Sequence, residues 1–176
     1  LNVQANSTGD VMLNKLTFSV ATTTVTNLAS ASFTFTGPNG NVGSSTPVLG
    51  SDGLTLIGYF DSNTNTNDRT VSAGTSKSFA LRYTNLALTG NTNTTGSVTI
   101  ALKADTATTT IVGSYLMAST SNAGLSTQNI LWSPISTTSV ASATTTLEDW
   151  TNGYGLGGCF ASSGLGQNCT GRTISK

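Results

Sequence analysis

Histidine is absent from this chain of 176 residues, glutamate occurs once, and charged residues make up 8% of the sequence. An ordinary globular domain carries about 25% charged residues. Without histidine, the usual Ser–His and Cys–His nucleophilic sites cannot be built. Glu148 and Asp149 would point to opposite faces of an extended chain, which does not suit the paired carboxylates of a glycosidase. The composition therefore predicts that the protein is not an enzyme and uses no cofactor.

Charge of either sign is also too scarce to form a patch. Seven Lys and Arg residues balance seven Asp and Glu residues, so the net charge is zero and no basic surface for nucleic acid is expected. The sequence contains no run of the 18 or more apolar residues that a membrane helix needs, so we expect no membrane insertion. The chain starts at Leu1 without a signal-peptide pattern, which indicates a processed end or an excerpt.

Alternating apolar and polar residues fill most of the chain, with Thr, Val, Phe and Tyr carrying the pattern. This period of two is typical of strands and predicts an all-β protein. Five apolar residues change parity midway along one segment: Val11, Leu13, Leu16, Phe18 and Val20. A β-bulge near Asn14-Lys15 would turn all five inward and leave Lys15 facing solvent. A similar parity switch at Gly58 predicts a second bulge or a close backbone approach.

Turn residues divide the pattern into short strands. Gly37-Pro38-Asn39-Gly40 predicts a chain reversal, and clear alternation covers residues 79–84 and 98–104. Short strands with regular turns predict a β-sandwich. After Asp105 the pattern weakens, although Ile111–Met117 and Asn129–Trp132 remain candidate strands. We expect a sandwich core over residues 1–118 and an irregular C-terminal extension over residues 119–176 that packs on it.

Four segments carry a resemblance to a known family: Val71–Leu81, Gly96–Ile100, Leu131–Pro134 and Asp149–Tyr154. They resemble immunoglobulin-like modules in large surface proteins of uncultivated bacteria with small genomes. The resemblance covers most of the chain and implies an immunoglobulin-like antiparallel β-sandwich in an exported or cell-surface protein without a defined activity. The two cysteines are not part of that pattern, and no functional residue can be carried over.

Cys159 and Cys169 lie in a Gly-rich tail, with no cluster of His, Cys or carboxylate residues nearby to complete a metal site. We expect a disulfide that closes this loop of the C-terminal extension and stabilises the fold by roughly 2–3 kcal/mol. Disulfides persist in oxidising compartments, so the pair indicates a secreted or cell-surface protein. The alternative is two unpaired thiols in a cytosolic protein.

Two ligand sites are candidates. Asp61, Asn63, Asn65 and Asp68 place oxygen ligands in a spacing similar to the start of a calcium loop, although Thr66 and Ser72 stand where such a loop has Gly and Glu. The alternative is an Asn-rich connection between strands.

Aromatic residues of the C-terminal third provide the second candidate. Trp132, Trp150 and Tyr154 could form a platform for a glycan. The alternative is that these aromatic side chains hold the C-terminal segment on the sandwich.

Lys15 is a candidate for covalent modification. A lysine buried in a sandwich can form an amide with an asparagine side chain when an acid is adjacent. The bulge predicted at Asn14-Lys15 turns this lysine toward solvent and therefore disfavours the reaction.

The scarcity of charge bears on self-association. Soluble β-proteins protect edge strands with lysine, proline or inward-pointing charges, because an unpaired edge recruits further chains. Such residues are scarce here, and zero net charge gives weak repulsion between copies. We therefore expect a structural subunit or module of an extracellular or cell-surface assembly, such as a filament, a pilus-like fibre or a surface layer, with copies of the chain as partners. The competing hypothesis is an adhesin-like module that binds carbohydrate or a host surface.

The N-terminal alternation of Leu1, Val3 and Ala5 indicates one route to assembly. This segment could be donated as a strand to a neighbouring subunit, where backbone hydrogen bonds would hold it. The alternative is an ordinary edge strand of the chain's own sandwich.

Overall fold

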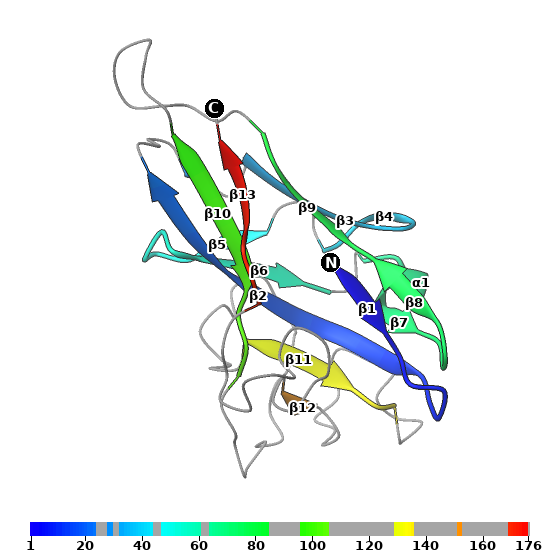
Figure 1. Ribbon diagram of the computed structural model, residues 1–176. Helices are drawn as coiled ribbons and strands as arrows, with labels where there is room; N and C mark the ends of the chain where they lie inside the picture. The colour runs from blue at the N-terminus through cyan, green and yellow to red at the C-terminus, as the bar shows by residue number, and fades with distance from the viewer. Residues whose placement is uncertain are drawn as a thin grey trace.

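The computed structural model describes residues 1–23, 28–29, 32–43, 47–60, 64–84, 96–105, 129–135, 151–152 and 169–175. These residues form antiparallel strands and one short helix, α1 (Thr66–Arg69), in two β layers around an apolar core (Figure 1). The all-β, sandwich-like class predicted from the period-two alternation is confirmed.

The larger sheet is built around β2 (Val11–Thr23). Its direct partners are β6 (Thr55–Tyr59), β7 (Thr70–Val71), β10 (Ser97–Leu102) and β11 (Ile130–Ser133). Residues 15 and 16 pair with both β6 and β11, and residues 18 and 19 pair with both β6 and β10. Since a strand has two edges, β10 and β11 follow one another along one edge of β2 and β6 occupies the opposite edge.

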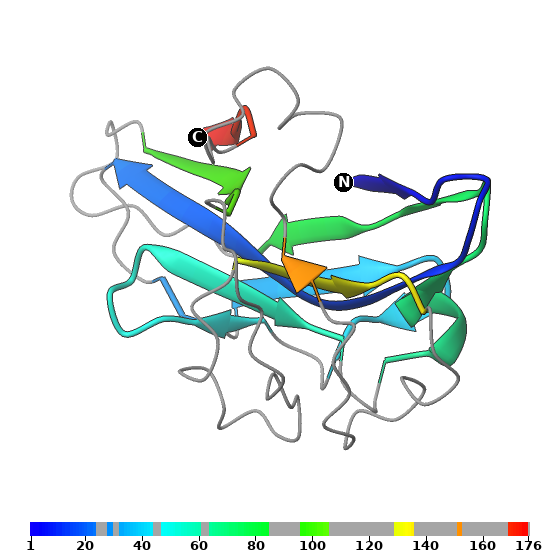
Figure 2. The same ribbon diagram turned by 90° about the horizontal axis from the view of Figure 1, so that it is seen from below.

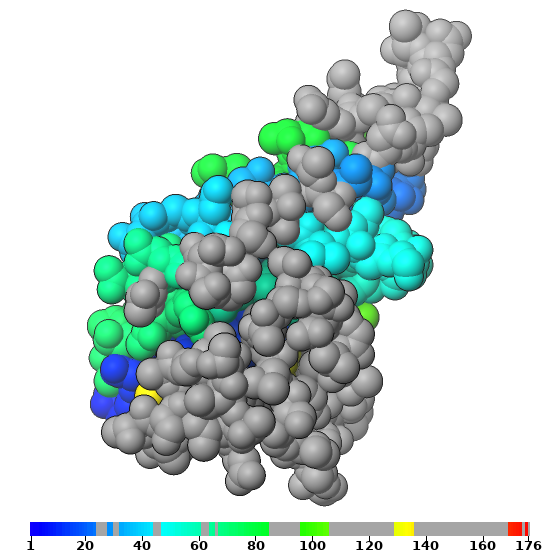
Figure 3. Space-filling view, turned by 180° about the vertical axis from the view of Figure 1, so that it is seen from behind, coloured from blue at the N-terminus to red at the C-terminus, as the bar shows by residue number. Residues whose placement is uncertain are grey.

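Three outer strands complete this sheet. They are β5 (Val48–Leu49) on β6, β12 (Thr151–Asn152) on β11 and β13 (Arg172–Ser175) on β10. The hairpin of β5 and β6 lies on the face of the molecule that Figure 3 shows. Strands β11, β12 and β13 all come from residues 119–176, for which the sequence predicts an irregular extension that packs on the sandwich. In the described residues this part supplies strands to the main sheet, so it does not merely pack on a finished sandwich.

The predicted bulge in β2 is confirmed. Leu131 pairs with Lys15, but the next residue, Trp132, pairs with Leu13, so Asn14 is an extra residue opposite β11. The five apolar residues on either side of it, Val11, Leu13, Leu16, Phe18 and Val20, all belong to the hydrophobic core or pack against it. The extra residue therefore lets one long strand keep its apolar side chains on one face.

The second layer contains β3 (Phe33–Gly37), β4 (Gly40–Asn41) and β9 (Ala80–Tyr83), with β3 in the middle. The predicted reversal at Gly37-Pro38-Asn39-Gly40 joins β3 to β4, and Gly40 has a φ of 139°, which favours glycine. A two-stranded sheet precedes β9 along the chain, formed by β1 (Asn2–Gln4) and β8 (Ser76–Ser78).

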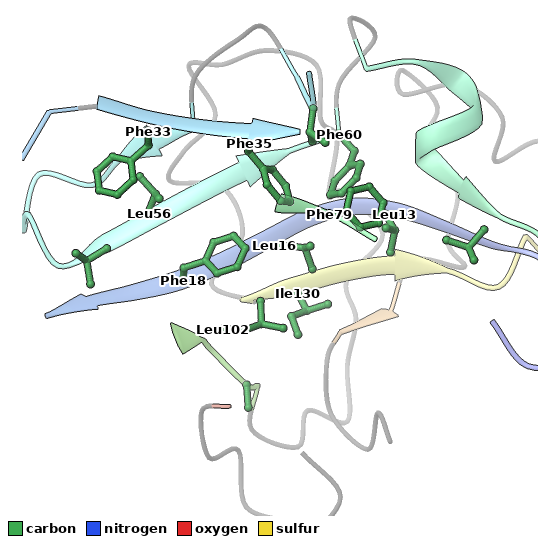
Figure 4. Packing of buried hydrophobic residues seen from close by; sticks show 14 of the residues in the cluster. Leu13, Leu16, Phe18, Phe33, Phe35, Leu56, Phe60, Phe79, Leu102 and Ile130 are labelled. Atoms are coloured by element: carbon green, nitrogen blue, oxygen red, sulfur yellow. The ribbon is translucent and has the colours of Figure 1, made fainter. Parts of the chain in front are cut away.

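Phe35 of β3 lies at the centre of the contact between the layers (Figure 4). Its ring centroid is 5.8 Å from that of Phe18 in β2 and 5.9 Å from that of Phe60, both in edge-to-face geometry. A Cβ atom on Gly58 would lie 2.8 Å from the Phe35 ring, and β6 pairs with β2 across Gly58 without a register shift. The close approach at Gly58 is therefore confirmed, and the alternative of a second bulge is wrong.

The N-terminal strand pairs within its own chain (Figure 2). The backbone N–H of Ala5 donates to the Thr75 carbonyl at 3.0 Å, and Ala5 is 2% exposed in the core. Val3 packs against the same core. This arrangement corresponds to the ordinary edge strand that the sequence left as the alternative to strand donation.

Candidate functional site

The strongest concentration of buried polar groups lies on the face of β2 that points away from the phenylalanine core. Lys15 is 4% exposed and Thr17 is 3% exposed, although both lie on the opposite side of the strand from Leu16 and Phe18. Their cross-strand neighbours Leu131 and Ile57 are also buried and lie outside the core cluster. Strand β2 is therefore covered on both faces, and the prediction that Lys15 faces solvent is wrong.

Asp105 lies near Lys15, just after the end of β10. Leu102 pairs with Phe18, and the backbone N–H of Lys103 donates to the Thr17 carbonyl at 2.9 Å. Beyond Lys103, β11 takes over this edge of β2, with Leu131 opposite Lys15. Asp105 therefore lies at the junction of β10 and β11, near enough to Lys15 for its charge to act on the amine. Asp105 is 3% exposed, so this residue is as deeply buried as the lysine.

The Asp105 carboxylate also joins the end of β10 to the start of β11. Its Oδ1 accepts a hydrogen bond from the backbone N–H of Asn129 at 2.5 Å, and its Oδ2 accepts one from Ile130 at 3.0 Å. The side-chain Nδ2 of Asn129 donates to the Ala104 carbonyl at 2.7 Å. An amine, a carboxylate and a carboxamide are thus gathered where β2, β10 and β11 meet.

The environment changes the acid–base properties of this cluster. Burial lowers the pKa of Lys15 from 10.5 to about 8; the Asp105 charge raises this pKa and the Lys103 charge lowers it. A larger fraction of the amine is therefore neutral, and hence nucleophilic, near neutral pH than for an exposed lysine.

Two hydroxyl groups on the same face have no hydrogen-bond partner. They are the phenol of Tyr59, which is directly opposite Lys15, and the Oγ1 of Thr17. Burial raises the pKa of Tyr59, so the phenol stays protonated and keeps its donor. Unpartnered buried hydroxyls are uncommon in folded proteins, and here both lie next to the buried amine.

A second feature is an exposed face made of small neutral residues at the far end of the same sheet. The register aligns Thr23 with Ser97 and Ser175, and Ala21 with Thr99 and Thr173. Ser19 and Ala101 form the next row. We call these eight residues the hydroxyl face; all are Ser, Thr or Ala, and all are exposed or half-buried.

Hydroxyl groups bond to one another across the strands of the hydroxyl face. Thr99 and Thr173 are joined at 2.7 Å between their Oγ1 atoms, and Thr23 and Ser97 at 2.9 Å. These bonds align the side chains in rows, and none of the eight residues carries a charge.

Asn65 and Asp68 are the two described residues of the proposed calcium site, and both accept hydrogen bonds from other parts of the protein. Asn65 Oδ1 accepts a hydrogen bond from the Asn67 backbone at the start of α1, and Asp68 is fully buried against Asn39. No group of three or more potential metal ligands of the His, Cys, Asp or Glu type occurs among the described residues. Asp61 and Asn63 lie outside the described residues, so the complete ligand set stays a prediction.

Trp132 is the one residue of the proposed glycan platform that the structure describes. Trp132 is half-buried and packs against the core, as the alternative interpretation expected. Trp150 and Tyr154 lie outside the described residues.

Cys169 is half-buried against the core, and its backbone N–H donates to the Leu102 carbonyl at 2.9 Å. The described part of the chain contains no free cysteine. Because Cys159 lies outside the described residues, the bond between Cys159 and Cys169 stays a prediction.

Comparison with known proteins supplies no relative: no protein-family model, curated protein or solved structure matches the chain. No helix among the described residues is long and apolar enough to cross a membrane. The sequence drew attention to Lys15 but missed Asp105, Asn129 and Tyr59. Extending the alternation of 98–104 by one residue would have placed Asp105 on the face opposite Leu102, which was the available signal.

Proposed function

We propose that the protein is a structural subunit or module of an extracellular or cell-surface assembly, in which copies of the chain pack against one another. The hydroxyl face carries the proposal. It extends over β2, β10 and the outer strand β13, and all eight of its side chains are small and uncharged. Two such faces can approach closely, because no charge loses its hydration and hydroxyls from one copy can pair with those of another.

The edges of the described strands refine this proposal. Arg172 on β13 and Arg82 on β9 are exposed, so two outer strands carry the kind of charge that opposes edge pairing. Arg172 pairs with Ile100, which packs against the core, so it belongs to the opposite face of the sheet from the hydroxyl face. Contact through the face is therefore supported better than contact through edges alone.

The finer features of the protein belong to the same proposal. An immunoglobulin-like sandwich, a disulfide between Cys159 and Cys169, secretion and a role without catalysis are together the properties of an exported structural module. Hydrogen-bonded hydroxyl rows and zero net charge support association between copies.

A charge placed in the hydroxyl face tests the proposal. Ala21 is exposed in the middle row of the face, so Ala21→Arg adds a cation that a second copy would have to bury. We expect the wild-type chain to form oligomers or fibres in light scattering and negative-stain microscopy, and the variant to stay monomeric. Thr8→Arg is the matched control, because it adds the same charge at an exposed turn outside the face.

Two outcomes would overturn this function. A wild-type chain that stays monomeric at high concentration would remove the basis for self-packing. Equal assembly of the wild type, Ala21→Arg and Thr8→Arg would show that copies associate elsewhere, and binding of the monomer to a glycan array would favour the competing adhesin-like role.

A further inference from the structure

We propose that the side chains of Lys15 and Asn129 join to form an intramolecular amide bond, with the Asp105 carboxylate transferring the proton. This bond would tie the central strand β2 to the start of β11 covalently. The inference concerns the chemistry of one chain and does not depend on the proposed assembly.

The register brings the amine and the carboxamide within reach. Leu131 pairs with Lys15, and Asn129 precedes Leu131 by two residues, so Asn129 shares the face of the sheet on which Lys15 lies. Such diagonal neighbours in antiparallel strands are about 7–8 Å apart, a separation that long side chains span. The four-carbon side chain of lysine is long enough to place Nζ against the Asn129 carboxamide.

The surroundings hold both reacting groups in place. Hydrogen bonds from the Asn129 backbone to Asp105 and from Asn129 Nδ2 to the Ala104 carbonyl fix the carboxamide beside the carboxylate. Lys15 is 4% exposed, and the apolar side chain of Leu131 is its direct neighbour. A confined pair reacts with a high effective concentration, and a carboxylate at the same point supplies proton transfer.

The reaction is balanced without a cofactor. The neutral Nζ of Lys15 attacks Cγ of Asn129, and the new C–N bond forms as Asp105 accepts a proton from Nζ. The Cγ–Nδ2 bond then breaks, and Asp105 returns the proton to the leaving nitrogen, which departs as ammonia. No group is oxidised or reduced. The lowered pKa of Lys15 favours the first step, because it increases the neutral fraction of the amine.

Intact-mass spectrometry of the reduced and alkylated full chain tests the bond. We expect the wild type to be lighter than its sequence by one ammonia, and a tryptic digest to contain the peptides of residues 15 and 129 joined. Lys15→Arg, Asn129→Ala and Asp105→Ala should each have the mass of the sequence. Lys103→Arg is the matched control, because this half-buried lysine lies on the same face and should leave the loss of ammonia unchanged.

Three results would overturn the proposal. The first is a folded wild type with the full sequence mass. The second is a loss of water, which would identify the Asp105 carboxyl as the partner of Lys15. The third is a loss of ammonia that persists in Lys15→Arg, as a succinimide at Asn39-Gly40 would produce. If Asp105→Ala fails to fold, the wild type, Lys15→Arg and Asn129→Ala still decide the question, with circular dichroism confirming their folds.

Discussion

The fully buried carboxylate of Asp68 accepts two hydrogen bonds from Asn39, one from the backbone N–H at 3.0 Å and one from Nδ2 at 2.7 Å. Asp68 belongs to α1, and Asn39 forms the turn between β3 and β4. The pair therefore holds the turn of one layer against a helix that leads into the other layer. A Cβ atom on Gly37 would lie 2.5 Å from Asp68 Oδ2, so the turn has no room for a side chain at that position.

Replacing Asp68 by alanine should lower the free energy of unfolding by about 2–4 kcal/mol, because it leaves two donors of Asn39 without a charged acceptor. Urea denaturation followed by circular dichroism measures the change. Asp52→Ala is the matched control: this aspartate also accepts several hydrogen bonds, from Leu54 and Thr55, but it is exposed to water. Equal losses in the two variants would contradict the importance of burial.

Gly58→Ala tests the contact between the layers. The added methyl group would meet the Phe35 ring at 2.8 Å, in a core whose aromatic rings are in contact, so we expect a loss of about 1–3 kcal/mol in unfolding free energy. Gly9→Ala adds the same methyl group at a position with no atom within 4 Å and should change stability little. A Gly58→Ala protein as stable as Gly9→Ala would show that the layers can separate at this point without cost.

The Asn129→Ala variant, in which Lys15 keeps its amine, should become more stable as the pH rises. The pKa of Lys15 is about 8 in the folded chain and 10.5 in the unfolded chain, so between these values the unfolded state binds more protons. Stability therefore increases from about pH 8 to pH 10.5, by about 1.4 kcal/mol for each unit of pKa difference that the variant retains. Urea midpoints across this pH range measure the effect. Lys15→Met combined with Asn129→Ala should remove it, and an unchanged pH slope in the double variant would contradict the assignment to Lys15.

Thiol titration of the denatured, unreduced chain should find no reactive cysteine, because Cys159 and Cys169 are expected to be bonded. Reduction should lower the unfolding free energy by roughly 2–3 kcal/mol. The backbone hydrogen bond from Cys169 to Leu102 connects this loop to the end of β10, so reduction should destabilise the main sheet as well as the loop. Two reactive thiols per chain would refute the bond, and with it the argument for an oxidising compartment.

Local alternation predicted the elements that depend on neighbouring residues. Apolar spacing and turn chemistry predict the strand from Val11, its bulge, the turn at Gly37–Gly40 and the inward positions of Leu16 and Phe18, and the structure confirms them. Each of these features depends only on a short stretch of chain, so the spacing of its apolar and turn residues is enough to predict it.

The burial of Lys15 could not be predicted in the same way. Its exposure depends on β6 and β11, which pair with β2 from distant parts of the chain and place Tyr59 and Leu131 at its sides. The predicted bulge placed Lys15 on the face away from the phenylalanine core, but the prediction that this face is open to solvent was wrong. The meeting of Asp105 with Asn129 has the same cause, because it depends on where β10 ends and β11 begins along β2.

Strand β2 lies early in the chain, yet Leu13 pairs with Trp132, and β10, which lies beside β2, pairs with β13 as far as Ser175. Such pairings must close long loops before they gain stability, which makes folding slow for the size of the chain. While the polypeptide is being synthesised, β2 has no complete set of neighbours until the C-terminal strands emerge. The large sheet can therefore close only after most of the chain has been made, so its closure is a late event in synthesis.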